Sequence, residues 1–274
     1  FNYEVLSMKQ YLRVAAVAFG TLIMSNSFAD GHGHHPKSDI DAVLAAQSDE
    51  HKARYGARHP KETLEFFEVK AGDTVMEANP GGGWYTKILL PLLGENGKLI
   101  GASYSPETFA SSPNTTPEST ARRVAWPTTW PSAVAEWGIE HGASVSAANF
   151  GAIPEEVNGT VDKVLFFRAM HGFARYEDKG GFLTSALEDS FRALKPGGIL
   201  GVVQHAARED RSDEWANGDA GYLKQSYVVA MATKAGFELV DSSDINANEL
   251  DQAKEGDIVW RVPPSLSTTK NDPE

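Results

Sequence analysis

The chain has 274 residues, of which 41% are hydrophobic, 23% are charged and none is cysteine. This composition excludes a disordered, collagen-like or disulfide-stabilised protein, and the length lets one domain bury a full hydrophobic core. The lack of cysteine also excludes thiolate nucleophiles and cysteine-ligated zinc or iron–sulfur sites. With 25 basic and 37 acidic residues, the formal net charge is -12, which argues against DNA or RNA as partners because polyanions are held by clustered Lys and Arg.

The N-terminal segment has the pattern of a Sec signal peptide, which we place at residues 1–29. Basic residues, the last of them Arg13, precede an apolar run over 14–24, and a small-x-small cleavage site ends at Ala29. The run is too short to span a bilayer comfortably. We therefore expect cleavage after Ala29, a periplasmic or secreted protein, and no membrane span in the mature form; residues 1–7 would precede the true start.

Composition shifts divide the remaining chain into four segments. We expect a flexible His-rich linker, an N-terminal helical cap, one α/β domain and a flexible tail, at residues 30–37, 38–70, 71–264 and 265–274 respectively. His32, His34 and His35 of the linker are close enough to chelate a transition metal loosely. A segment with nothing to bury is typical of a solvated linker, however, and we predict no metal site.

Helical and strand patterns alternate along the chain. In the cap, apolar residues recur at helical spacing from Ile40 behind a capping Ser38 or Asp39, and a second helix begins at Pro60. Strands are expected at residues 73–78, 98–103, 143–147, 161–167, 199–204, 237–241 and 258–262, and helices at 84–93, 182–194 and 224–235. This alternation predicts an α/β, Rossmann-like doubly wound sheet that is mostly parallel, with helices on both faces.

One long segment does not follow this alternation. The residues from Tyr104 to Thr129 are rich in Ser, Thr and Pro and are expected to be irregular, before a short helix that reaches Trp137. Such a long loop is unusual in a compact domain. Trp126, Trp130 and Trp137 either form an aromatic lid over a site or pack this segment onto the core.

Polar side chains follow the predicted strands at the edge where a doubly wound sheet binds ligands, outside the carboxyl ends of its strands. They are Glu77, Asn79, Tyr104, Asn149, Arg168, His171, His205, Asp244, Asn246 and Asn248. Histidine, arginine and asparagine are groups that orient ligands, whereas lysine and glutamate at a surface mainly solvate it. The sequence therefore predicts a binding site along this edge.

The most informative segment is 75–85, where Glu77 and Asn79 lead into three consecutive glycines at 81–83 between a strand and a helix. Glycines at such a junction let the backbone approach a ligand and aim amide groups at it. The spacing is neither G-x-G-x-x-G nor G-x-x-x-x-G-K-S/T, which disfavours a nicotinamide cofactor and a nucleoside triphosphate. A tight turn without a ligand is the alternative interpretation.

In these features the chain resembles the class I S-adenosylmethionine-dependent methyltransferases. The resemblance rests on Glu77, on the glycines at 81–83 and on the Leu-Lys-Pro-Gly-Gly turn at 194–198. A narrower resemblance, to an exported family of predicted methyltransferases, rests on residues 58–62, 80–85, 168–172 and 246–248. Together they cover residues 50–264 and imply a seven-stranded sheet whose last strand is antiparallel.

The resemblance implies S-adenosylmethionine as cofactor. The implied cofactor contacts are Glu77, Asn79, Gly81, Gly82, Gly83, Trp84, Tyr85, Tyr104 and Asn149. Glu77 would hold the loop or the cationic amino group, and Trp84 or Tyr85 would face the sulfonium. The chain departs from the family where Ser103 and Tyr104 replace the usual ribose-binding acid, whereas Asn149 is able to accept a hydrogen bond from the adenine amino group.

The resemblance also implies transfer of a methyl group to a small acceptor. The expected catalytic residues are His171, His205 and Arg168, and the expected substrate-binding residues are Arg58, His59, Asn246 and Asn248. A histidine takes up a proton near neutrality, and arginines grip an anionic group through forked donors. Each histidine alone is better explained as structural, but the two together at one edge favour a functional role. A surface pair with Glu62 is the alternative explanation for Arg58.

Three functions stay open at this point. The first is a methyltransferase that acts on a small molecule. The second is a non-catalytic binding protein for a nucleoside or an anionic metabolite, and the third is a different acid–base enzyme that uses His171 and His205 on the same fold. Glu77 and the glycines favour the first, while the missing acid and an exported location, away from the cytoplasmic source of the cofactor, favour the other two.

Overall fold

The structure is a computed structural model that describes residues 10–17, 39–248, 251–262 and 265–267. Its strands are β1 (Gln10–Val17), β2 (Thr74–Ala78), β3 (Lys98–Ser103), β4 (Ser144–Asn149), β5 (Val161–Phe167), β6 (Leu194–Ala207), β7 (Leu223–Lys224) and β8 (Phe237–Ser243). The α-helices are α1 (Ile40–Ala45), α2 (Asp49–Lys52), α3 (Tyr55–Arg58), α4 (Pro60–Phe66), α5 (Thr86–Leu93), α6 (Pro106–Ala110), α7 (Pro117–Ala135), α8 (Met170–Ala174), α9 (Glu177–Gly180), α10 (Phe182–Ala193) and α11 (Gln225–Lys234). Two 3-10 helices, η1 (Glu155–Val157) and η2 (Val259–Arg261), complete the described elements.

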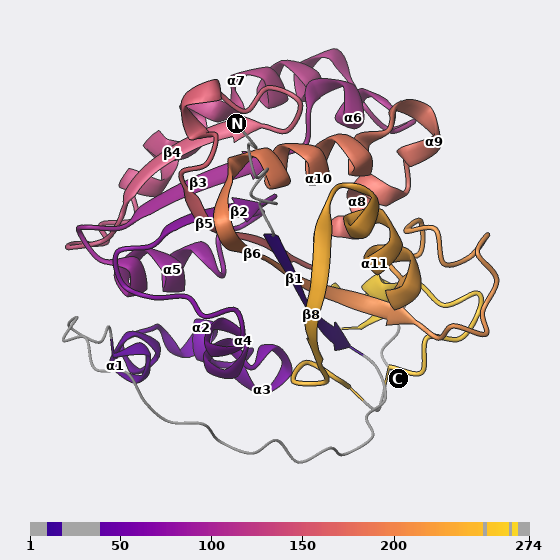
Figure 1. Ribbon diagram of the computed structural model, residues 1–274, viewed down its shortest axis with the longest axis horizontal. Coiled ribbons are helices and arrows are strands. Elements are labelled where there is room, and N and C mark those ends of the chain that lie inside the picture. Colours follow the sequence, from indigo (N-terminus) through magenta and orange to yellow (C-terminus); the bar gives the residue numbers. More distant parts are fainter. Residues whose placement is uncertain (1–9, 18–38, 249–250, 263–264, 268–274) are drawn as a thin grey trace, which may run out of the picture.

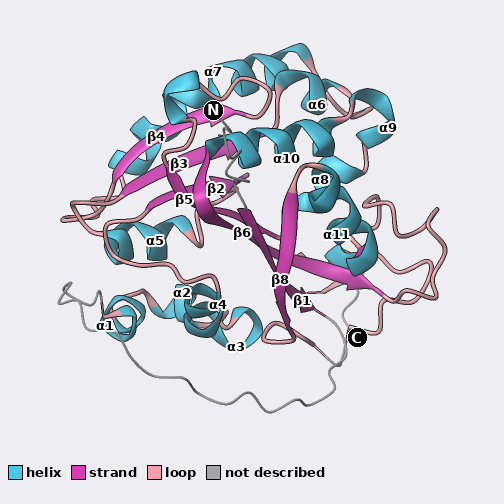
Figure 2. Cartoon of the chain, viewed as in Figure 1, coloured by secondary structure: helices cyan, strands magenta, loops and turns pink. Residues whose placement is uncertain are grey.

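An eight-stranded sheet forms the centre of the molecule. The strand order is β4-β3-β2-β5-β6-β1-β8, and β7 pairs with β6 off this path. Every strand pairing among the described residues is parallel. Helices lie on both sides of the sheet (Figures 1 and 2). The predicted α/β, Rossmann-like fold is therefore confirmed.

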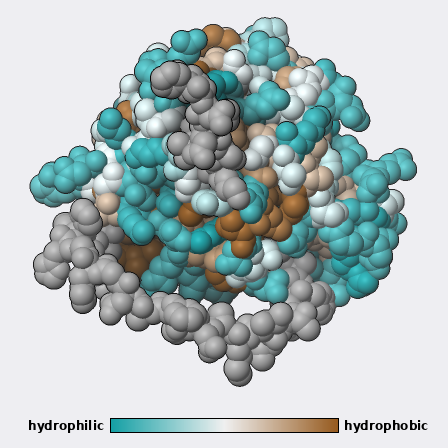
Figure 3. Space-filling model, in the orientation of Figure 1, coloured by the Kyte–Doolittle hydropathy of each residue, from teal (hydrophilic) through white to brown (hydrophobic). Residues whose placement is uncertain are grey.

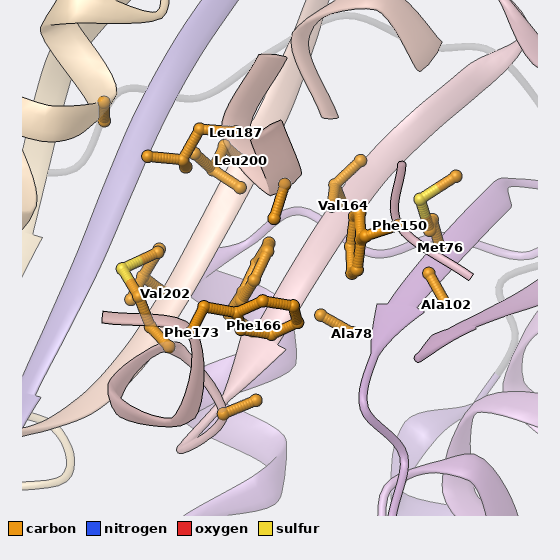
Figure 4. Close-up of a cluster of buried hydrophobic side chains, with 14 of the residues drawn as sticks. Met76, Ala78, Ala102, Phe150, Val164, Phe166, Phe173, Leu187, Leu200 and Val202 are labelled. Atoms are coloured by element: carbon orange, nitrogen blue, oxygen red, sulfur yellow. The ribbon is translucent and has the colours of Figure 1, made fainter. Parts of the chain in front are cut away.

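The two faces of the sheet are buried by alternate residues of the same strands. On one face, Met76 and Val164 join a cluster with Leu187 of α10 and Phe173 of α8 (Figure 4). On the other face, Val75 belongs to a second cluster that includes residues of α1, α4, α5 and α7. Full burial of an aliphatic or aromatic side chain contributes about 1.5–3 kcal/mol, so both layers of helices are held by the period-two pattern of the strands.

Most predicted elements are present within a few residues of their expected bounds. β3 and β5 have the bounds expected from the sequence. Asp39 caps α1, because its carboxylate accepts hydrogen bonds from the amides of Asp41 and Ala42. Pro60 occupies the first turn of α4.

The prediction of an irregular segment from Tyr104 to Thr129 is wrong, because α6 and most of α7 lie there. Thr116 and Ser119 form a capping box at the start of α7, and Pro117 occupies its first turn. Serine, threonine and proline, which suggested a loop, here serve to begin a helix. Helix α7 also contains two internal prolines, at which the helical hydrogen-bond ladder is interrupted.

The aromatic side chains of this region pack onto the core rather than form a lid. Trp130 is buried, and its ring centroid lies 5.1 Å from that of Trp126. A Cβ atom on Gly101 of β3 would lie 2.6 Å from the Trp130 ring, so this glycine makes room for the ring. Of the two interpretations of these tryptophans, packing onto the core is the one that the structure supports.

The end of the chain also differs from expectation. Residues 258–262 were expected to be a strand, but Val259–Arg261 form η2, and the antiparallel last strand implied by the resemblance is not made by these residues. The strand next to β6 is instead β1, which lies between β6 and β8.

β1 comes from the segment that the sequence analysis placed in a signal peptide. Its register with β6 runs from Tyr11 to Val17, and β8 has β1 as its strand partner in the described sheet. Leu12 and Val14 are buried, and Arg13 forms an ion pair with Glu68. The cleavage site at Ala29 and the His-rich linker at 30–37 lie outside the described residues. Within the described chain, no helix has the length and apolar character needed to cross a membrane.

Candidate functional site

A cavity of about 510 Å³ opens at the carboxyl ends of β2, β5 and β6. Its walls come from α2 and α3 of the helical cap, from the loops after β2 and β5, from the end of β6 and from the segment around η2. The volume lies within the range of about 300–1,000 Å³ that is usual for sites binding small molecules. Its position agrees with the rule that ligands of doubly wound sheets lie outside the carboxyl ends of the strands.

The glycine loop after β2 contributes exposed backbone to this cavity. Asn79 has a left-handed backbone with φ 48°, and its amide donates a hydrogen bond of 2.6 Å to the carbonyl of Ala102. Gly81 and Gly82 line the cavity, and a Cβ atom on Gly82 would meet no atom within 4 Å. Gly83 has a different role, because a Cβ atom there would lie 2.2 Å from the Trp137 ring. Two of the three glycines therefore face open space, and the third makes room for a side chain.

Glu77 lies at the end of β2, buried at the floor of the cavity. The hydroxyl of Thr86 donates a hydrogen bond of 2.6 Å to its Oε2 atom. Burial raises the pKa of Glu77 to about 7, because the ionised carboxylate is removed from water, and the Thr86 hydrogen bond offsets only part of this effect. Glu77 therefore changes protonation near neutrality, and a cationic group in the cavity would favour its ionised form.

The aromatic residues after the glycines are held by the protein itself. Tyr85 stacks on Phe167 at 3.6 Å, and its hydroxyl donates to the carbonyl of Arg58. Trp84 stacks on His51 at 4.5 Å, and the guanidinium carbon of Arg58 lies 4.4 Å from the Trp84 ring centroid. Both aromatic residues line the cavity, but their rings already contact side chains of the chain.

Two histidines line the cavity from adjacent strands. His171 begins the turn of α8 after β5, and His205 lies near the end of β6. Burial lowers the pKa of His171 to about 4 and that of His205 to about 3. The charge of Arg168 contributes to both of these shifts, and both rings are neutral at pH 7. The Nδ1 atom of each ring is buried and has no hydrogen-bond partner in the described residues.

Asp251 is a buried neighbour of this site that the sequence analysis did not identify. Its Oδ2 atom lies 3.9 Å from Nδ1 of His205, and its Oδ1 atom accepts hydrogen bonds from Tyr222 and Arg261 at 2.7 and 2.9 Å. The residue lies outside regular secondary structure, in a stretch without hydrophobic periodicity, so no sequence signal pointed to it. His51 and Arg54 of the cap also line the cavity and were not predicted as site residues.

Several predicted site residues lie away from this cavity. The hydroxyl of Tyr104 donates to the carbonyl of Ala169, and the Asn149 amide donates to the carbonyl of Arg123. Arg123 in turn donates to the hydroxyl of Ser103. The edge beside β3, where the ribose and adenine were expected, is thus filled by the side chain of Arg123.

The substrate residues predicted from the sequence are also separated. Arg58 lines the cavity together with Arg168. His59 is not among the lining residues and links α3 to α4 with a left-handed backbone of φ 41°. The Asn246 amide donates to the Thr63 hydroxyl at 3.0 Å in the protein interior, which is a structural role. Asn248 is not among the residues that line the cavity.

No family model matches the chain, and no curated protein is significantly similar to it. Similar solved structures include a SAM-dependent methyltransferase from Aquifex aeolicus, with 20% identity over 72% of this chain and 88% of that chain and a TM-score of 0.46. An arsenic(III) S-adenosylmethionine methyltransferase from Chlamydomonas reinhardtii has 17% identity over 72% and 61%, with a TM-score of 0.39. The cyclase SpnF has 18% identity over 66% and 57%, with a TM-score of 0.44.

Proposed function

We propose that the protein is an S-adenosylmethionine-dependent methyltransferase that acts on a small molecule. The observation that carries this proposal is the open backbone of Gly81 and Gly82 beside the buried carboxyl of Glu77. This arrangement fits the methionine end of the cofactor, because backbone amides receive its carboxylate and Glu77 receives its cationic amino group. Asn79, Trp84 and Tyr85 complete the proposed cofactor contacts.

The fit is weaker at the nucleoside end. We leave Tyr104 and Asn149 out of the proposed contacts, because neither lines the cavity and Arg123 lies against the edge beside β3. The Oδ1 atom of Asn149 is nevertheless buried and has no hydrogen-bond partner in the described residues. Gly83 is also left out, because it makes room for Trp137. Ribose and adenine would have to be held by other residues of the cavity.

When bound, S-adenosylmethionine supplies an electrophilic methyl group on a sulfonium. The residues of the chain then have to orient the acceptor and take up its proton. We assign this role to His205 and His171; both are neutral and line the cavity together with Arg168, which supports the assignment. Their low pKa makes them weak bases, and an anion bound beside Arg168 would raise the pKa by offsetting one cause of the lowering.

The buried pair of His205 and Asp251 favours a second candidate function, a different acid–base enzyme on the same fold. The Asp251 carboxylate lies 3.9 Å from Nδ1 of His205, and a movement of less than about 1 Å would bring the two groups into the carboxylate–imidazole contact that acid–base catalysts use. This candidate needs no cofactor at the glycine loop. A non-catalytic binding protein is the remaining alternative, and binding measurements alone do not distinguish it from an enzyme.

Calorimetry with S-adenosylmethionine and S-adenosylhomocysteine tests the proposed function. We expect micromolar binding that is lost in Gly82→Val, because the added side chain enters the cavity. Gly56→Val is the matched control, since a Cβ atom at Gly56 also meets no atom within 4 Å and this residue does not line the cavity. Absence of binding with both ligands would remove the proposal and leave the second candidate.

We also propose export of the protein, on the signal-peptide pattern at residues 1–29. Cleavage after Ala29 would remove β1 from the sheet, so the exported form would differ from the described one at this strand. N-terminal sequencing of exported material, which should begin at Asp30, tests the proposal. A sequence that still contains residues 10–17 would overturn it.

A further inference from the structure

Three arginines line the cavity and have no carboxylate partner among the described residues. They are Arg54, Arg58 and Arg168. In the part of the chain that the structure describes, none of them forms an ion pair or donates a side-chain hydrogen bond. Arg13, Arg175, Arg192, Arg208, Arg211 and Arg261 do pair with carboxylates. In a chain with 37 acidic residues, three unpaired guanidinium groups at one cavity call for an explanation.

The arginines are held in place at a cost to folding. Arg58 lies against the Trp84 ring, and Arg168 has a left-handed backbone with φ 54°, which is strained for a residue other than glycine. Burial and the neighbouring charge of Arg168 lower the pKa of Arg58 to about 9. Repulsion between like charges and backbone strain are often retained at sites where they contribute to ligand binding.

The acids of the cavity do not neutralise these charges. Glu50 is exposed, and Glu77 is half-protonated at neutral pH because burial raises its pKa to about 7. Lys87 lines the cavity as well, with its ammonium 5.0 Å from the Trp137 ring, and adds a fourth cation. At neutral pH the lining residues therefore carry an excess of about two to three positive charges, which is opposite in sign to the protein as a whole.

We infer that Arg54, Arg58 and Arg168 form a subsite for a dianionic group of the acceptor, either a phosphomonoester or a dicarboxylate. A single negative charge would leave two of the three guanidinium groups without a counterion, whereas two charges on one group match the excess of the cavity. Forked arginine donors bind such groups in two-point contacts. That the dianionic group belongs to a methyl acceptor rests on the proposed function, whereas the anion subsite does not.

The test measures binding of inorganic phosphate, malonate, sulfate and acetate to the full chain by calorimetry. We expect sulfate to bind at least about tenfold more tightly than acetate. The ratio of phosphate affinity to sulfate affinity should rise from pH 6 to pH 8, because more of the phosphate is then doubly ionised, whereas sulfate keeps its charge and reports the ionisation of Glu77 over the same range. Tighter binding of phosphate than of malonate at pH 8 assigns a phosphomonoester, and the reverse assigns a dicarboxylate. Equal binding of acetate and sulfate, or no binding of any dianion, would overturn the inference.

Matched variants locate the subsite. Arg58→Gln and Arg168→Gln should each weaken sulfate binding about tenfold or more, since a hydrogen bond to a charged group contributes about 1.5–3 kcal/mol. Arg122→Gln removes the same charge from an exposed residue outside the cavity and should leave affinity unchanged. Circular dichroism checks that each variant is folded. An equal loss in all three variants would mean a general charge effect and would contradict the inference.

A second titration separates this inference from the proposed function. With S-adenosylhomocysteine at saturation, sulfate should bind with unchanged affinity, because the acceptor and the cofactor occupy the cavity together. Competition between the two would assign the arginines to the cofactor carboxylate and overturn the acceptor subsite. If S-adenosylhomocysteine fails to bind while sulfate binds and responds to Arg168→Gln, the proposed function fails and the anion subsite stands.

Discussion

The Nδ1 atom of His205 lies 3.9 Å from the Oδ2 atom of Asp251, and both side chains are buried. This distance is longer than a hydrogen bond, but the carboxylate is fixed by Tyr222 and Arg261 on its other oxygen. Asp251 therefore lies between His205 in the cavity wall and two residues outside it, Tyr222 and, in η2, Arg261. Loss of its charge should affect both the stability of the fold and the state of His205.

We predict that Asp251→Asn lowers the free energy of unfolding by about 1–3 kcal/mol, because it removes a buried partner of Arg261 and Tyr222. Asp257→Asn is the matched control, since Asp257 also pairs with Arg261, at 3.0 Å, but is more exposed. Its cost should stay below about 1 kcal/mol. Urea denaturation measures both variants, and the imidazole nitrogen shifts of His205 should change only in Asp251→Asn. Equal losses of unfolding free energy in the two variants, together with unchanged nitrogen shifts of His205, would contradict this role of Asp251.

The two cavity histidines predict acid sensitivity. Their pKa values in the folded protein, about 4 for His171 and about 3 for His205, lie below the ordinary value of about 6.5. Between pH 6.5 and these values the unfolded chain binds more protons than the folded one, so stability is fully present above pH 6.5 and is lost as the pH falls. From pH 7 to pH 5 the loss is about 2 kcal/mol for each histidine.

The variant His171→Gln/His205→Gln isolates this effect. Thermal or urea unfolding of the parent and the double variant at pH 7 and pH 5 gives the difference in pH dependence directly. We expect the variant to lose about 4 kcal/mol less than the parent over this range, because glutamine does not titrate. The same pH dependence in both proteins would mean that the histidines are not buried as described.

Glu77 predicts the opposite trend with pH. Its pKa in the folded protein, about 7, exceeds the ordinary value of 4.5, so the folded state binds the proton more tightly and stability falls as the pH rises through this range. Glu77→Gln should therefore gain up to about 3 kcal/mol over the parent between pH 4.5 and pH 8. The same variant should bind S-adenosylmethionine more weakly, because it lacks the carboxylate for the amino group. If Glu77→Gln changes neither the pH dependence of stability nor the affinity for S-adenosylmethionine, then the pKa of Glu77 is not raised and the residue does not contact the ligand.

The third glycine of the loop gives a prediction that concerns packing alone. Gly83→Ala places a methyl group 2.2 Å from Trp137 on a backbone with φ 74°, and we expect a loss of about 2–4 kcal/mol. Gly82→Ala, which meets open space, should cost less than about 1 kcal/mol. Urea denaturation measures both, and Trp137→Leu should restore part of the loss when combined with Gly83→Ala. Equal costs at the two positions would mean that the loop packs differently.

The sequence predicted the fold better than the site, for physical reasons. Strand periodicity and the turn at 194–198 are local signals, and β3 and β5 follow them. Contacts between residues that are distant in the sequence leave no local signal. Asp251 lies beside His205 although 46 positions separate them. Arg123 contacts the end of β3 from α7, whose composition suggested a loop. Asn246 shows that a polar residue near a strand end is also suited to a structural hydrogen bond, here to Thr63. His59 links two helices and does not line the cavity.

The N-terminal segment shows why the signal-peptide pattern is ambiguous. A signal peptide and a buried parallel strand both require a short apolar run, and periodicity does not separate them. In the structure the start of this run forms the second half of β1, a strand that places Leu12 and Val14 in the core. β8 joins the sheet through β1, and hydrophobic side chains gather on the surface over β8 (Figure 3), where Leu239 and Val240 are exposed.

We predict that a chain beginning at Asp30 is less stable than the full chain by several kcal/mol. Deletion removes the backbone pairing of β1 with β6 and β8 and uncovers apolar surface that Leu12 and Val14 now bury, at about 1.5–3 kcal/mol for each side chain. Hydrogen exchange should become fast in β8 but stay slow in β2 and β5, which pair with other strands. Leu12→Ala in the full chain should reproduce part of the loss, about 2–5 kcal/mol, without any deletion. Equal unfolding midpoints for the two chains, with β8 still protected, would mean that another segment takes the position of β1 once the N-terminus is removed.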